Sequence, residues 1–203
     1  MEKKIIRLKE VDSTNRFLKE LSSYDETALT IAVADFQTAG RGQGTHTWES
    51  EEGKNLLFSM LACPVWVPVR QQFLLSEVGA LAIKDALDSY ADGFTLKWPN
   101  DVYWNDRKIS GTLIETSIDS RGIKRCIFGI GININQMEFR SDAPNPVSLA
   151  QILGHEVDKE EVLQKVIEAF CRYYELLRRA DYMDVSGIYH LSLYRRKGYH
   201  WYE

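Results

Sequence analysis

In residues 127–135, every second position from 129 on is a glycine or an asparagine, and the positions between them are isoleucines. A ligand could lie against the bare backbone of the glycines. Successive side chains of a strand point to opposite faces, so one face of this segment is apolar and the other ends in amides. The second face consists of Gly129, Gly131, Asn133 and Asn135. Glycine weakens a strand unless something approaches its backbone closely. The pattern therefore predicts either the floor of a ligand site or a strand packed tightly under a helix.

The segment 37–48 (QTAGRGQGTHTW) places Arg41 between two glycines. Such a loop can wrap an anion with its backbone N–H groups while the arginine supplies positive charge. Trp48, at the end of the segment, could stack on a nucleotide base. A mobile surface connection is the usual explanation of a glycine-rich loop taken alone, and a single tryptophan is usually a core residue.

A third polar group follows further along the chain. Lys97 ends an apolar strand, where an ammonium group is costly to bury unless an anion pairs with it. Asn100 and Asp101 follow a proline-fixed turn and could face a metal or a phosphate, although an Asx turn is the favoured explanation in isolation. Lys108 could simply be solvated. The four histidines lack a neighbouring serine or cysteine in a nucleophile setting, which argues against a hydrolase triad.

These residues need strands and helices to position them. Apolar and β-branched runs predict strands at residues 30–36, 56–62, 94–98, 112–118 and 126–135. The polar stretch 105–108 would join the third of these strands to the fourth. Helical spacing predicts one helix that starts within residues 12–15, another over 70–91 and a long one capped by Asp158 with Glu161. Because the strands come in groups between helices, we expect an α+β fold with a largely antiparallel sheet.

The composition narrows the function classes. The 203 residues carry a formal net charge of −4 with a pI near 5.7, so no basic field is available for nucleic acid. Residues 1–11 lack the apolar stretch of a signal peptide, and no apolar run is long enough to span a membrane. The three cysteines match neither a disulfide framework nor a metal site. We expect a cytoplasmic protein with no nucleic-acid or membrane partner.

Five motifs taken together resemble those of biotin protein ligases in order and in spacing. They are DSTN at 12–15, GRGQ at 40–43, KWPND at 97–101, RKISG at 107–111 and GIGININ at 129–135. The resemblance implies the fold shared with lipoate ligases and related to class II tRNA synthetases, a mixed, largely antiparallel sheet flanked by helices. That fold agrees with the α+β expectation.

The resemblance also implies a reaction. Biotin's carboxylate attacks the α-phosphate of ATP, in the presence of Mg²⁺, to give biotinyl-5'-AMP and pyrophosphate. A lysine on the biotin carboxyl carrier protein domain of a biotin-dependent carboxylase then accepts the biotinyl group. Both first reactants are anions, so positioning and electrostatics would supply most of the catalysis. The implied activity is that of a monofunctional biotin–[acetyl-CoA-carboxylase] ligase.

Residue roles follow from the same resemblance. Biotin or its adenylate is expected to contact Ser13, Thr14, Asn15, Gln37, Arg41, Gly42, Gln43, Lys108, Gly111 and Gly131. The nucleotide is expected to contact Trp48, Lys97, Asn100, Asn133 and Asn135, and Mg²⁺ to contact Asp101. Arg41 and Lys108 are the expected catalytic charges, because they would hold the reacting carboxylate and phosphate.

The sequence departs from the family pattern in its loop and at its ends. Gly44, Thr45 and His46 stand where relatives often carry more basic residues, so we expect the adenylate to be held more loosely. No winged-helix segment precedes residue 12, so a DNA-binding repressor role is not expected. Residues 1–190 are expected to form the catalytic domain, and 191–203 the start of a truncated, small C-terminal β domain.

Two other functions remain open from the sequence. A lipoate or octanoate ligase would share the fold and the adenylation chemistry, although the motifs at 40–43 and 97–101 weigh against it. A non-catalytic protein that binds biotin would keep the pocket but release no pyrophosphate. Homodimerisation is possible and leaves no readable pattern.

Overall fold

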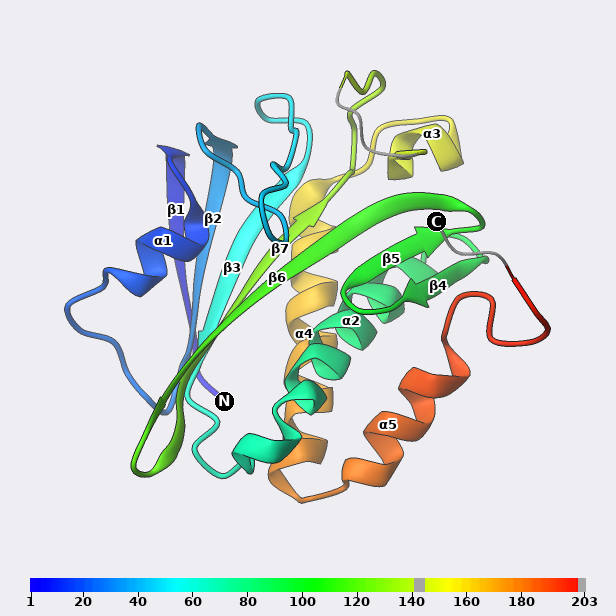
Figure 1. The fold of residues 1–203 in the computed structure, drawn as a ribbon. Coiled ribbons are helices and arrows are strands. Elements are labelled where there is room, and N and C mark those ends of the chain that lie inside the picture. Colours follow the sequence, from blue (N-terminus) through cyan, green and yellow to red (C-terminus); the bar gives the residue numbers. More distant parts are fainter. Residues whose placement is uncertain (141–144, 201–203) are drawn as a thin grey trace.

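A single mixed sheet organises the chain in the computed structural model, which describes residues 1–140 and 145–200 (Figure 1). Its strands are β1 (Lys3–Val11), β2 (Leu29–Gln37), β3 (Leu56–Ala62), β4 (Phe94–Lys97), β5 (Asp101–Trp104), β6 (Arg107–Asp119) and β7 (Gly122–Ile132). They lie in the order β1-β2-β3-β7-β6-β5-β4. The β1–β2 pair is parallel and the other neighbouring pairs are antiparallel. The expected α+β fold with a largely antiparallel sheet is confirmed.

Helices cover the two faces of the sheet unequally (Figure 1). The helices are α1 (Thr14–Lys19), α2 (Phe73–Asp88), α3 (Leu149–Leu153), α4 (Lys159–Arg178) and α5 (Tyr182–Leu191), with a 3-10 turn at Val69–Gln71. On one face α2 and α4 pack together over the sheet, and Phe128 of β7 meets Phe170 of α4 at a ring-centroid distance of 5.0 Å. The short α1 lies on the other face. Helices therefore cover that face less than the first.

A small second core fixes α1 to this more open face. It comprises Leu18, Ala32, Leu61, Cys63 and Ile127, all buried. Ser13 is the N-cap residue of α1, which confirms that a helix starts within residues 12–15. Because α1 is only six residues long, tertiary contacts rather than helix propensity must hold it in place.

Several predicted elements need correction. The stretch 105–108 does not join the third predicted strand directly to the fourth, because β5 lies between them and β6 already begins at Arg107. β5 has four residues, too few to show a period of two. β1 was not predicted, because lysines and an arginine interrupt its apolar pattern. The long helix α4 is capped as expected, with Asp158 accepting a hydrogen bond from the backbone N–H of Glu160.

The segment after α5 extends the β4 edge of the sheet. Leu193 forms an isolated parallel bridge with Leu96, and the backbone N–H of Tyr194 donates to the Leu96 carbonyl at 2.8 Å. Part of the predicted second domain, residues 201–203, lies outside the described residues. The assignment of 191–203 to a further domain stays a prediction. Over residues 1–140 and 145–200, the structure contains no helix with the length and apolar character needed to cross a membrane.

Candidate active site

Three glycines form the floor of the candidate site on the face that carries α1. Gly111 of β6 pairs with Gly131 of β7, and Gly129 lies two residues earlier on β7. A Cβ atom added at Gly131 would lie 2.4 Å from Trp48 Cε2, and one at Gly111 would lie 3.1 Å from Trp48 Cζ3. The indole of Trp48 thus lies directly on this backbone. We call Gly111, Gly129 and Gly131 the glycine floor.

Gly129 meets α1 instead of the tryptophan. A Cβ atom at Gly129 would lie 2.2 Å from Asn15 Oδ1, far closer than any real contact. The interpretation of the strand as one packed tightly under a helix is therefore correct at Gly129. At Gly131, by contrast, the close neighbour is the side chain of a loop residue, Trp48.

Buried polar side chains surround Asn15. The backbone N–H and the hydroxyl of Thr14 both donate to Gln37 Oε1, at 2.8 and 3.0 Å. The Ser59 hydroxyl lies 2.7 Å from Thr14 Oγ1 and 2.6 Å from Asn15 Oδ1. The amide nitrogen of Asn15 donates to Glu115 Oε2 at 2.8 Å and to the Leu113 carbonyl at 3.3 Å. This set of hydrogen bonds fixes the orientation of the amide.

The start of α1 uses some of its own donors. Ser13, Thr14 and Asn15 are all buried, and the Ser13 N–H donates to Asp12 Oδ1 at 2.6 Å. Since the Thr14 N–H is already bonded to Gln37, these two N–H groups serve the protein rather than an anion. A ligand would therefore contact side chains of α1 rather than these two backbone N–H groups.

The loop that carries Arg41 folds as a small hairpin. Arg41 bridges Thr47, the Gly42 N–H donates to the His46 carbonyl at 2.7 Å, and Gly44 has a φ of +65°. The Arg41 guanidinium contacts Glu115 Oε2 at 3.3 Å, and half of the Arg41 side chain is exposed. The hairpin thus returns the chain to Trp48 and directs Arg41 towards β6. Gln43 lies exposed at its tip.

Lys108 lies beside the glycine floor, with its Cε 3.4 Å from a Cβ atom added at Gly111. Its Nζ is 2.8 Å from Asp101 Oδ1 and 5.9 Å from the centroid of the Trp48 ring. The side chains of Lys108 and Asp101 are 26% and 18% exposed, so this ion pair is more shielded than that of Arg41. Both expected catalytic cations therefore already contact a carboxylate.

The three asparagines expected near the nucleotide bond to backbone. Asn100 Nδ2 donates to the Thr112 carbonyl at 2.8 Å, and Asn133 Nδ2 donates to the Val147 carbonyl at 3.2 Å. Asn135 forms two bonds of 2.9 Å with the backbone of Val157. These amides fix the loops that follow β4 and β7, and their expected nucleotide contacts stay predictions.

Lys97 is half-buried at the end of β4. Its Nζ donates to the Tyr103 hydroxyl at 3.1 Å and lies 4.7 Å from the centroid of the same ring. A tyrosine hydroxyl and ring face can thus hold the ammonium without neutralising its charge. Lys97 pairs with Asp101 in the β4–β5 register, which links it to the Lys108 ion pair.

Ser59 and Glu115 complete the site and were not among the predicted residues. Ser59 is the one polar side chain of the apolar strand LLFSMLA. A buried polar group needs a partner, so Ser59 carried a readable signal. Glu115 did not, because the stretch TLIETSI around it also contains threonines and a serine. Only the folded arrangement brings both side chains to Asn15.

The cysteines take no part in the chemistry of the site. Cys63, Cys126 and Cys171 are all free. Burial raises the pKa of Cys63 to about 11 and raises the pKa values of Cys126 and Cys171 as well. The groups are therefore protonated thiols at neutral pH, and none is a ready thiolate nucleophile.

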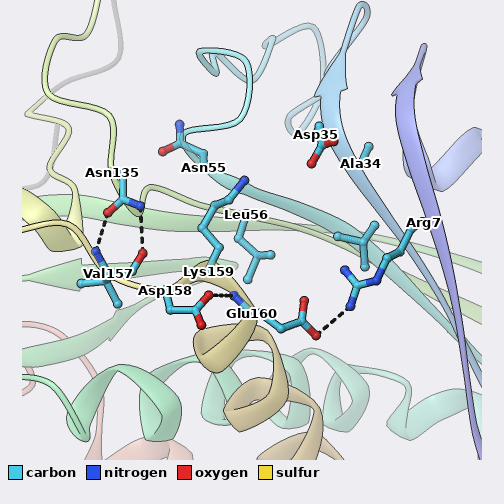
Figure 2. Close-up of a pocket in the computed structure, with 11 residues that line it drawn as sticks. Arg7, Ala34, Asp35, Asn55, Leu56, Asn135, Val157, Asp158, Lys159 and Glu160 are labelled. Carbon is cyan, nitrogen blue, oxygen red and sulfur yellow. Dashed lines mark hydrogen bonds and ion pairs between the residues drawn. The ribbon is translucent and has the colours of Figure 1, made fainter.

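Two hollows of the described structure lie away from the glycine floor. A hollow of about 320 Å³ at the N-terminal end of α4 is lined in part by Arg7, Asp35, Lys159 and Glu160, and Figure 2 shows the ion pair between Arg7 and Glu160 within it. A second hollow of about 610 Å³ is lined in part by residues 49–51. Neither includes the glycine floor, because the Trp48 indole covers it. A ligand on the floor would have to displace that ring.

Comparison with known proteins assigns the chain to a family. Residues 8–133 match the biotin/lipoate A/B protein ligase family. The chain is 32% identical over 179 residues to the bifunctional ligase/repressor BirA of Bacillus subtilis, covering 85% of this chain and 53% of the relative. It is 34% identical over 174 residues to the biotin–[acetyl-CoA-carboxylase] ligase of Paracoccus denitrificans, covering 82% of this chain and 71% of the relative.

A solved structure agrees with these relatives. The biotin protein ligase of Aquifex aeolicus, in complex with biotin and ATP, has a TM-score of 0.81 and 35% identity, covering 94% of this chain and 78% of that one. The chain spans about half the length of the BirA relatives. From the matched region, the sequence identity and the shared fold, we conclude that the chain belongs to the biotin/lipoate A/B protein ligase family.

Proposed function

We propose that this chain activates biotin with ATP to form biotinyl-5'-AMP and transfers the biotinyl group to a lysine of a biotin carboxyl carrier protein. The observation that carries the proposal is the placement of two cations, Arg41 and Lys108, beside the glycine floor. Both contact carboxylates of side chains that surround it, at 3.3 and 2.8 Å. The relatives named as biotin ligases support the same reaction.

Biotin would lie on the glycine floor after Trp48 moves away. Its ureido ring has both donors and acceptors, which suit the buried side chains of Ser13, Thr14 and Asn15 and the partly buried amide of Gln37. Gly42 and Gln43, in the loop hairpin, would cover the substrate. Removing the indole exposes bare backbone, so the planar ureido ring can approach closely.

The two cations would act on the reacting groups. As biotin's carboxylate attacks the α-phosphate, negative charge builds on the pentavalent phosphorus and on the leaving pyrophosphate. Arg41 and Lys108 stabilise this charge more strongly than they stabilise the separate substrates, which lowers the barrier. A closed loop would also keep water from hydrolysing the adenylate.

The nucleotide would extend from Trp48 towards Lys97. Stacking on the indole would hold the adenine, and the Lys97 ammonium, supported by Tyr103, would contact the phosphates. Asn100, Asn133 and Asn135 would contribute mainly by fixing the loops around the nucleotide.

Magnesium would enter with ATP, held by its phosphates and Asp101. Within residues 1–140 and 145–200 no group of three or more potential metal-ligand side chains occurs. A single carboxylate is nevertheless enough when phosphates supply the other ligands. Asp101 contacts Lys108 through Oδ1. The magnesium ion would neutralise part of the triphosphate charge.

The proposal includes partners and location. The acceptor would be the carrier domain of a biotin-dependent carboxylase, consistent with the name of the Paracoccus denitrificans relative. A cytoplasmic location fits the three free cysteines. Homodimerisation remains a prediction from the resemblance. Lipoate or octanoate ligation is the less favoured alternative, because the named relatives and the solved complexes concern biotin.

Biotin-dependent exchange of labelled pyrophosphate into ATP tests the proposal. We expect exchange with biotin, none with lipoate or octanoate, and loss of exchange in Lys108→Ala. Lys84→Ala is a matched control, since Lys84 also forms an ion pair but lies on α2. Tight biotin binding without exchange would favour a non-catalytic binding protein, and exchange with lipoate would favour the alternative ligase.

A further inference from the structure

Glu115 joins three segments that build the site. It lies on β6, two residues along the same sheet face from Leu113 and four from Gly111. Its Oε2 accepts from Asn15 Nδ2 at 2.8 Å and contacts Arg41 Nη2 at 3.3 Å, while Oε1 lies 3.7 Å from Lys19 Nζ. One carboxylate therefore connects α1, the loop hairpin and the sheet.

The contact with Asn15 fixes an amide in the site. Both N–H donors of Asn15 are used, by Glu115 and by the Leu113 carbonyl, and the amide oxygen lies 2.6 Å from the Ser59 hydroxyl. Without an acceptor at Glu115 the amide could rotate. A rotated amide would present the wrong group to a ligand on the glycine floor.

The contact with Arg41 fixes a charge. Arg41 is on a loop and half of its side chain is exposed, so it has many conformations to lose. A carboxylate at 3.3 Å selects conformations in which the guanidinium points towards β6. Because the contact is made through one nitrogen of a group with five N–H donors, donors remain for a substrate anion.

We propose that Glu115 is a positioning residue for adenylation, which orients Arg41 towards the reacting carboxylate and phosphate and holds Asn15 in place. This inference rests on the proposed function. Glu115 is not catalytic in itself, because its contacts are to protein side chains. Its effect should appear in the rate of the chemical step more than in biotin binding.

Glu115→Gln separates the two contacts. The glutamine oxygen can still accept from Asn15, but the charge that attracts Arg41 is lost. We expect kcat for biotin-dependent pyrophosphate exchange to fall about tenfold, as for loss of a charge-assisted hydrogen bond. The KM for biotin should change by less than about threefold, because the contacts that bind biotin before the reaction are kept. Asp119→Asn, which removes an ion pair further along β6, is the matched control and should leave both constants unchanged.

Coupling to Arg41 tests the mechanism directly. In an Arg41→Ala background, Glu115→Gln should have less than about a twofold further effect, because contacting residues are not additive. Full multiplication of the two effects would overturn the inference, as would unchanged kinetics of Glu115→Gln in an active protein. A wild type that shows no biotin-dependent exchange would instead overturn the proposed function, and the role of Glu115 with it. Thermal unfolding of each variant verifies that it is folded.

Discussion

The glycines of the sheet and the turn glycine Gly44 of the loop serve opposite purposes in the site. On the glycine floor, added Cβ atoms at Gly129 and Gly131 would lie 2.2 and 2.4 Å from neighbouring side chains. In the loop, Gly44 has no neighbour within 4 Å of its would-be Cβ and has a φ of +65°. The sheet glycines allow close contact, whereas Gly44 allows a backbone turn in open space. Gly40, at the start of the loop, resembles the sheet glycines, because its would-be Cβ lies 2.9 Å from the Trp48 carbonyl oxygen.

The two expected catalytic cations are divided between these regions. Lys108 is anchored on β6 in a shielded ion pair of 2.8 Å, and Arg41 is on the loop in a more exposed contact of 3.3 Å. Electrostatic stabilisation is most effective when the charge is already in place before the reaction. The comparison therefore ranks Lys108 above Arg41 in catalysis.

Replacing each cation is the strongest test of that ranking. We expect Lys108→Ala to lower kcat/KM for pyrophosphate exchange about 1,000-fold and Arg41→Ala about 100-fold, the range seen for removal of one oxyanion-stabilising donor. Steady-state exchange kinetics with saturating Mg²⁺ measure both. If Arg41→Ala were the more damaging change, the fixed position of Lys108 would not be what matters.

Gly129→Ala should show how little the floor tolerates. The methyl group would collide with the amide of Asn15, which Ser59 and Glu115 hold from two sides. Overpacking of this kind lowers the free energy of unfolding by about 1 to 3 kcal/mol. Urea denaturation followed by circular dichroism measures the change. Gly187→Ala is the control, because Gly187 lies in α5 with no neighbour within 4 Å of its would-be Cβ and without a positive φ. An equal loss there would show that the close contact at Gly129 is not the cause.

Trp48→Ala should separate biotin binding from ATP binding. The KM for ATP should rise about tenfold, because stacking on a base contributes about 1 to 3 kcal/mol. Biotin affinity should not fall, since the indole occupies the glycine floor and would have to leave it for biotin to bind. Calorimetric titration with biotin and exchange kinetics with varied ATP measure the two effects. A matching loss of biotin affinity would show that the indole contacts biotin rather than covering its place.

A more basic loop should produce the smallest effect. His46 lies at the end of the hairpin turn, where its backbone bonds to Gly42 and Gln43. His46→Arg adds a cation without disturbing those bonds, and we expect adenylate release to slow about threefold, in line with a single exposed charge contact. Release is followed by loss of labelled adenylate from the enzyme. If the wild-type loop already releases adenylate as slowly as a fully basic relative, the expectation of loose retention is wrong.

Much of the fold followed from the sequence because its buried elements have strong patterns. Apolar runs predicted β2 and β3 to within a residue or two, and helical spacing predicted α2 and α4. β1 escaped prediction because it pairs with β2 alone and its exposed positions carry charges. Charged edge positions protect a sheet from further pairing but obscure its period of two.

The sequence predicted only those site residues that belong to the five motifs or follow from the resemblance. Thr14, Asn15 and Gln37 do come together, and Trp48 does reach the glycine floor. Local spacing carries no information about which distant carboxylate will face a given cation. The ion pairs of Arg41 and Lys108, and the place of Ser59 beside Asn15, depend on strand order and register, which tertiary packing decides.

The Asn15–Glu115 hydrogen bond joins residues one hundred positions apart in the chain. Contacts of such wide separation form late in folding, because the entropy of closing a long loop opposes them until the intervening strands have paired. α1 can dock only once β3, β7 and β6 are adjacent. Partly folded chains would therefore lack the proposed biotin site. Biotin affinity would then report completion of the native sheet, and bound biotin would slow global unfolding more than local fraying.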